Sequence, residues 1–155
     1  MYSKEKNKED ILYILNHLRK EDEYECRRLM GDEYKEKILD SIYCESKYFL
    51  LGCKKSDDTP VCMGGCSETN EKGVCVVWLL STNEIVNYRH CVLRHIKKEI
   101  KKYKNEYWLI YNFIFKKNHL AKMWLYKLGF AFMELRNIPA GFELFYWKRK
   151  LRGLE

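Results

Sequence analysis

Two cysteines in the segment PVCMGGCSE, residues 60–68, carry thiols that could serve a metal or redox site. Cys62 and Cys66 flank a pair of glycines, and turn-forming residues border the segment, which indicates an extended strand. Along a strand the two thiols lie about 13 Å apart at roughly 3.3 Å per residue, too far for a disulfide or a shared zinc ion. We therefore predict a strand that happens to carry thiols.

A second set of potential ligands lies further along the chain. Cys91 and His95 are one helical turn apart, and His90 is adjacent, so two of these side chains could face one ion. A closed zinc site needs four ligands, and no neighbouring residue completes the set. We predict no metal site.

Two carboxylates, Asp22 and Glu25, follow the apolar stripe of the first predicted helix. Asp22 comes four residues after Leu18, so it falls at the edge of the buried face. We interpret it as a structural charge paired with Arg19 or another basic residue. The alternative is a catalytic base, but a carboxylate without a positioned partner specifies no reaction.

The composition indicates one domain spanning residues 1–155. The chain is 46% hydrophobic, enough to bury a core at this length. Its start, MYSKEKNKED, is charged, and no apolar run reaches the roughly 18 residues of a membrane span, so we expect neither a signal peptide nor a transmembrane helix. Seven cysteines, an odd number, favour reduced thiols and an intracellular, soluble protein.

The net charge of +7 is concentrated in RHIKKEIKKYK, residues 94–104, and KRKLR, residues 148–152. Such a balance favours acidic partners, namely nucleic acid, phosphorylated ligands or an acidic protein surface. A nucleic-acid interface would use the lysines of the helix predicted at 86–104 and would stack bases on Tyr146 and Trp147. These lysines are Lys97, Lys98, Lys101 and Lys102. A solvated helix face is the simpler interpretation.

Hydrophobic periodicity predicts a particular order of elements. Helices are expected at 8–29, 33–44, 86–104 and 119–128, the last capped by Asn118, and strands at 46–54, 61–68, 74–81, 107–115, 130–135 and 142–148. The order is therefore α-α-β-β-β-α-β-α-β-β.

This order resembles that of the Gcn5-related N-acetyltransferase (GNAT) family. The segment NHLAKMWLYKLGFAF, residues 118–132, is similar to the signature of the family's fourth helix. The matching positions are Asn118, Ala121, Leu128, Gly129 and Phe130. The resemblance implies an α/β (α+β) fold, an acyl-CoA N-acyltransferase type with a mixed sheet of about six to seven strands and about four flanking helices.

A narrower resemblance is to the phage family that includes the internal virion protein A of T7-like podoviruses. The resemblance rests on two motifs. The first-helix pattern is represented by Leu18, Arg19, Asp22 and Glu25, and the Pro-x-x-x-Gly-Gly strand by Pro60, Gly64 and Gly65. The resemblance implies a virion-associated or assembly accessory protein with other phage virion proteins as partners. The location would be the cytoplasm of a bacterial host, and the virion once packaged.

The chemistry of the GNAT family requires a glycine-rich turn that binds the coenzyme A diphosphate through backbone N–H groups. The corresponding junction, LLSTNEIVNYRHCVL at 79–93, has no glycine. The family's acid, a tyrosine seven residues after the helix-capping Asn, falls on Leu125, and Tyr126 is one residue further, turned by about 100°. Tyr126 is thus the only candidate acid, and we expect a degraded acetyl-CoA site with no bound cofactor.

The alternative is an active enzyme that uses acetyl-CoA with a non-standard phosphate site. Arg89, and Arg94 after it, would then replace the glycine turn. The backbone of Leu79, Leu80 and Ser81 would polarise the acyl carbonyl group, and Asn118 would complete the cofactor site. Whether the chain is an enzyme, an acetyl-CoA-dependent N-acyltransferase, therefore stays open at this point, as does a nucleic-acid-binding accessory role.

Overall fold

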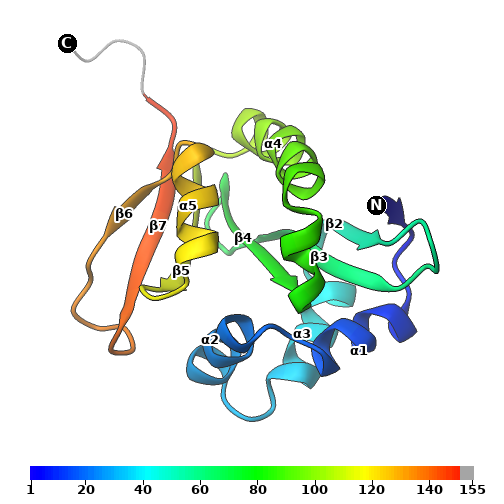
Figure 1. Cartoon of the computed structure of the whole chain (residues 1–155). Helices are drawn as coiled ribbons and strands as arrows, with labels where there is room; N and C mark the ends of the chain where they lie inside the picture. The colour runs from blue at the N-terminus through cyan, green and yellow to red at the C-terminus, as the bar shows by residue number, and fades with distance from the viewer. Residues whose placement is uncertain (151–155) are drawn as a thin grey trace.

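The computed structural model describes residues 1–150 and consists of one seven-stranded sheet with helices on both faces (Figure 1). The strands are β1 (Tyr2–Lys4), β2 (Ser46–Cys53), β3 (Pro60–Glu68), β4 (Val74–Ser81), β5 (Leu109–Phe115), β6 (Ala131–Met133) and β7 (Phe142–Lys148), in the spatial order β1-β2-β3-β4-β5-β7-β6. The helices are α1 (Lys8–Asn16), α2 (Lys20–Met30), α3 (Tyr34–Cys44), the 3-10 helix η1 (Asn83–Asn87), α4 (Arg89–Glu106) and α5 (His119–Lys127). Leu151 and Arg152, at the end of the basic KRKLR segment, lie outside the described residues.

Alternating side chains of the central strands place the two halves of the core on opposite faces of the sheet. Leu80 packs with residues of α1 and α3, such as Ile14 and Ile42. The preceding Leu79 points the other way and packs in the cluster that contains Val92 of α4 and Trp124 of α5. Helices α1 to α3 therefore cover one face, and α4 and α5 cover the other (Figure 1).

The parallel strands β4 and β5 pair at only three positions and then diverge. The pairs are Val74–Leu109, Cys75–Ile110 and Val76–Tyr111. Just beyond them the Asn112 side chain donates a hydrogen bond of 2.9 Å to the carbonyl oxygen of Val77. An amide side chain thus occupies the start of the gap, and the sheet opens toward the ends of both strands.

The glycine pair of β3 allows the neighbouring strands to approach closely. A Cβ at Gly65 would lie 2.0 Å from the carbonyl oxygen of Tyr48 in β2, and one at Gly64 would lie 2.7 Å from that of Trp78 in β4. The β2–β3 register also shifts between Ser46 and Tyr48. The Gly-Gly pair is therefore a packing requirement of the sheet.

We expect Gly65→Ala to lower the free energy of unfolding by about 2–3 kcal/mol, because a methyl group there must displace backbone on a central strand. Gly64→Ala should cost less, since its closest backbone contact is longer. Urea unfolding of both variants measures the difference. Equal stability of Gly65→Ala and the wild type would contradict this account.

The prediction of one helix over 8–29 is wrong, because the chain breaks between α1 and α2. At the break Leu18 forms an isolated bridge with Thr82, and the Arg19 N–H donates to the carbonyl oxygen of Ser81 at 2.9 Å. Tertiary contact with the end of β4 thus outweighs the helical periodicity. Residues 1–150 therefore contain five α-helices where about four were expected, and β1 is an additional strand.

The prediction for the cysteine segment is confirmed, since Cys62 and Cys66 both lie within the continuous strand β3. All seven cysteines are free. Among residues 1–150 no three His, Cys, Asp or Glu side chains form a group suited to a metal ion. No helix of this described part is both long and apolar enough to cross a membrane.

Candidate functional site

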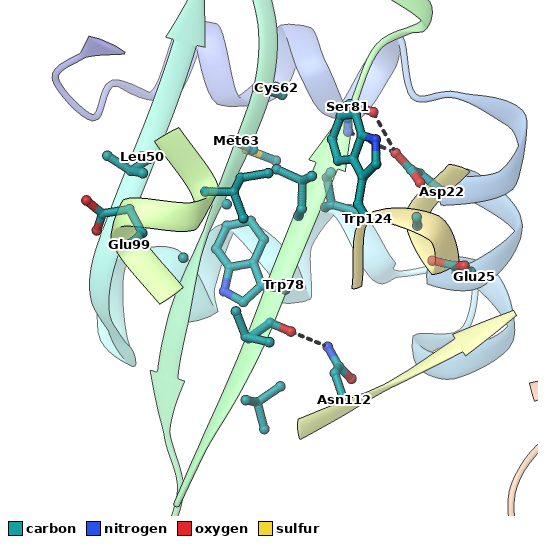
Figure 2. A pocket seen from close by; sticks show the side chains of 18 of the residues that line it. Asp22, Glu25, Leu50, Cys62, Met63, Trp78, Ser81, Glu99, Asn112 and Trp124 are labelled. Atoms are coloured by element: carbon teal, nitrogen blue, oxygen red, sulfur yellow. Dashed lines mark hydrogen bonds between the residues drawn. The ribbon is translucent and has the colours of Figure 1, made fainter. Parts of the chain in front are cut away.

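A cavity of about 620 Å³ lies where β4 and β5 diverge (Figure 2). Its lining includes Ile38 of α3 on one side of the sheet and Ile96 of α4 on the other, so the cavity reaches both faces. Most of its lining residues are apolar, and a volume of this size suits a small-molecule site. The lining residues that matter for chemistry are Glu25, Trp78, Leu79, His95, Asn112 and Trp124.

Side chains satisfy several of the backbone groups that the splayed strands leave without a ladder partner. Asp22 accepts from the Ser81 N–H at 2.9 Å and from its hydroxyl at 3.0 Å. Two N–H groups of β5 are satisfied in the same way. The Phe115 N–H donates to Glu25 of α2 at 3.1 Å, and the Phe113 N–H donates to the Asn112 side chain at 2.7 Å. The opening is therefore a maintained feature of the fold, because unpaired buried backbone groups are costly.

One donor of β4 remains available to a ligand. The Val77 carbonyl and the Ser81 N–H both point toward the gap, and strand alternation places the Leu79 N–H between them on the same side. The β4–β5 ladder ends at Val76, and within residues 1–150 no side chain donates to or accepts from the Leu79 backbone. Leu79 thus presents a free N–H group to the cavity.

Glu25 is a titratable group of this cavity whose pKa lies near neutrality. Burial raises the pKa of Glu25 to about 7, and the hydrogen bonds from Asn118 and Phe115 and the charge of Arg19 offset only part of that effect. The Asn118 amide donates to Glu25 at 2.8 Å and accepts from the Arg19 guanidinium at 3.1 Å. The carboxyl group therefore has the positioned partners that the sequence did not reveal.

Asp22 has the structural role that the sequence predicted, but with a different partner. It is 4% exposed, and burial raises its pKa although the Arg19 charge acts in the opposite direction. Its hydrogen bonds go to Ser81, and Arg19 instead contacts Asn118 and Glu21. Asp22 ties α2 to the end of β4 and thereby holds Glu25, one turn further along, at the cavity.

The predicted site residues separate into two groups. Leu79, Leu80, Ser81 and Asn118 all line the cavity. Arg89 is exposed at the start of α4 and does not line it. Asn118 lies at the N-cap of α5, but its side chain makes no capping hydrogen bond, because it is committed to Glu25 and Arg19.

The helix α5 keeps the register that residue counting gave. Leu125 lines the cavity, whereas Tyr126 is 76% exposed and lies outside the lining. A catalytic role of Tyr126 stays a prediction that this geometry does not support. Asn112 and Trp124 were overlooked; the signal for Asn112 was a lone amide within the apolar strand YWLIYNFIF, because a buried polar side chain needs a partner.

The junction between β4 and α4 forms no glycine cradle. It folds as η1, in which Ile85 N–H donates to Thr82 and Tyr88 N–H to Ile85. Glu84 at this place pairs with Lys54 at 3.1 Å. The first turn of α4 carries no acidic residue, so Arg89 and the helix N-terminus are left to attract an anion.

Comparison with known proteins identifies the fold. No known protein family and no curated protein matches the sequence. Solved structures do match along 96% of the chain. PaiA N-acetyltransferase from Thermoplasma acidophilum, in complex with coenzyme A, has a TM-score of 0.65 at 15% identity, with 98% of its own chain covered.

Two further solved structures are similar to this chain over nearly its whole length. A Bacillus subtilis acetyltransferase in complex with CoA has a TM-score of 0.64 at 9% identity, and 96% of this chain and 97% of that chain are covered. The Campylobacter jejuni N-acetyltransferase PseH, in complex with acetyl coenzyme A, has a TM-score of 0.56 at 16% identity, with coverage of 96% and 99%. The predicted GNAT fold is therefore confirmed.

Proposed function

We propose that this GNAT-fold chain transfers an acyl group from a pantetheine thioester, with acetyl-CoA as the expected donor, to an amine. The observation that carries the proposal is one cavity through the splayed sheet that contains both a carboxyl group with a pKa of about 7 and a free backbone N–H, those of Glu25 and Leu79. The proposal is also supported by the CoA complexes of the PaiA and Bacillus subtilis structures.

Glu25 serves as the general base in this proposal. A base acts best when its pKa lies near the working pH, since it is then both deprotonated and able to take a proton. Its carboxylate removes a proton from the attacking amine. Asn118 and the Phe115 N–H hold the carboxylate in place.

Leu79 polarises the acyl group. Its N–H is a preorganised donor for the carbonyl oxygen, on which negative charge grows during attack. The neighbouring Ser81 N–H cannot serve, because Asp22 already accepts its hydrogen bond. The arrangement therefore leaves a single backbone donor at the reacting carbon.

The residues fit the pantetheine part of the donor better than its diphosphate. The bound thioester supplies the activated acyl group. Leu125 has no proton to give, so the thiolate leaves unassisted and is protonated by water, which is feasible for a thiol with a pKa of about 8.5. Arg89 and the N-terminus of α4 are the candidates for phosphate contact.

We expect Ala121→Phe to weaken acetyl-CoA binding at least about tenfold, because Ala121 lines the cavity and a ring there narrows the path of the thioester arm. Isothermal titration measures the change. The matched control is Met123→Phe on the same helix. The Met123 side chain is 46% exposed, so this variant should bind acetyl-CoA as the wild type does. No binding of acetyl-CoA or of any other pantetheine thioester to the wild type would overturn the proposal.

A second candidate is a non-catalytic accessory role in a phage, associated with the virion. Leu125 at the position of the family's acid and the glycine-free η1 junction favour the non-catalytic part of this role. The phage part rests on the sequence resemblance alone. This candidate predicts that no acyl transfer accompanies any binding of acetyl-CoA. Mass spectrometry of purified virions tests it, together with the proposed location in the bacterial cytoplasm or the packaged particle.

A further inference from the structure

We propose that the thioester arm reaches this chain on an acidic carrier protein, which docks on the basic outer face of α4. The inference rests on the proposed function, and it names the donor. A carrier protein bears pantetheine through a single phosphodiester, so it presents the same thioester without the diphosphate of coenzyme A. The missing glycine cradle and the charge on α4 then have one explanation.

Helix α4 holds most of the net charge of the protein. Its 18 residues contain seven Lys or Arg and two Glu, a net charge of +5 out of +7 for the whole chain. Apart from Arg89 in the first turn, four of these cations, Arg94, Lys97, Lys98 and Lys101, are exposed and lack a salt bridge within residues 1–150. We call these four residues the basic face of α4. Lys102 instead pairs with Glu99 at 2.6 Å.

This arrangement opposes the stability of the helix. Lys97 and Lys101 are like charges one turn apart, as are Arg94 and Lys98, and each such pair costs a few tenths of a kcal/mol. Positive charge in the first turn, with no acid beside Arg89, also opposes the helix dipole. A solvent face needs no such concentration, so an acidic partner is the physical reason for it.

The basic face adjoins an entrance to the cavity. His95 is exposed and also lines the cavity, so it marks an opening on the α4 side. Arg94 precedes it, and Lys98 follows it by nearly one turn. A partner held by the basic face is therefore close enough to the opening to insert a flexible arm.

Nucleic acid would account for the charges but not for their place beside the cavity or for the absent cradle. The carrier protein accounts for all three. In the transfer, the amine nitrogen bonds to the acyl carbon, the carbon–sulfur bond breaks, and the electron pair stays on the carrier's sulfur. The amine loses one proton to Glu25 and the thiolate gains one from water, which balances the step.

The test is binding of a bacterial fatty-acid acyl carrier protein, fluorescently labelled and prepared with and without phosphopantetheine. We expect the pantetheine form to bind the wild type, more tightly at low than at high salt. The charge reversal Lys97→Glu, Lys98→Glu and Lys101→Glu should weaken binding at least about tenfold. The matched control, Lys8→Glu, Lys55→Glu and Lys72→Glu, makes the same charge change at exposed positions off α4 and should leave the affinity within about twofold.

Equal loss in both triple variants would overturn the proposal, because it would reflect net charge alone. Equal binding of the carrier with and without its arm would do so too, as would tight binding of a short duplex DNA in place of the carrier. Titration with acetyl-CoA distinguishes failure of this inference from failure of the proposed function. If acetyl-CoA binds and the carrier does not, this inference fails while the proposed function stands; if neither binds, both fail.

Discussion

Glu25→Gln is expected to lower the rate of acyl transfer by about 10²–10³-fold, the usual contribution of a general base. Glutamine can still accept the hydrogen bonds that Asn118 and the Phe115 N–H donate to Glu25, so the cavity should keep its shape. In the wild type kcat/KM should rise with pH through about 7, the pKa of Glu25, and this rise should vanish in the variant. Steady-state kinetics across pH measures both effects.

The same variant should have a pH-dependent effect on stability. The pKa of Glu25 is raised in the folded protein, so its folded-state protonation stabilises the protein below the unfolded pKa of about 4.5, and that contribution is lost as pH rises through 7. Glutamine does not titrate, so the variant loses no stability from this source between pH 4 and pH 8.5. We expect unfolding free energies that match at pH 4 and differ by about 2–3 kcal/mol in favour of Glu25→Gln at pH 8.5.

The control for both measurements is Glu36→Gln, an exposed carboxyl group on α3 that should change neither profile. A structural role of Glu25 alone predicts the stability effect without the kinetic one. An unaltered pH–rate profile in Glu25→Gln would therefore exclude Glu25 as the base.

Asp22→Ala should lower the free energy of unfolding by about 3–5 kcal/mol, the cost of removing one partner from a buried polar network. The substitution leaves the Ser81 N–H and hydroxyl without an acceptor, and it removes a buried carboxyl group close to Arg19, which keeps its ion pair with Glu21 at 3.4 Å. Urea unfolding at pH 7 measures this loss. The release of α2 from β4 should also return the pKa of Glu25 toward its ordinary value, because water then reaches the carboxyl group.

Asp22→Asn distinguishes hydrogen bonding from charge at this position. Its amide oxygen can still accept from Ser81, and burial already disfavours the charged carboxylate, so we expect a loss of only about 1 kcal/mol. If Asp22→Asn proves as damaging as Asp22→Ala, then the charge opposite Arg19, and not the link to Ser81, holds the site together.

Patterns local in the chain were sufficient for most of the elements, but not for the break between α1 and α2 or for the strand β1. The polar residue Asn7, which directly precedes the first predicted helix, caps α1, and its side chain accepts from the Asp10 N–H at 2.9 Å. Counting along α5 placed Leu125 at the position that faces the cavity, because helical geometry fixes the angle between successive side chains. The fold followed from these elements and from the signature at 118–132.

Contacts between segments distant in the sequence decided the site. Glu25 and Asn118 are 93 residues apart, and the pKa of Glu25 depends on burial between α2, β5 and α5. The helix break at Arg19 likewise required the end of β4. Periodicity reports which face of an element is apolar, but burial of a single carboxyl group, a free N–H and a cavity exist only once those faces have packed.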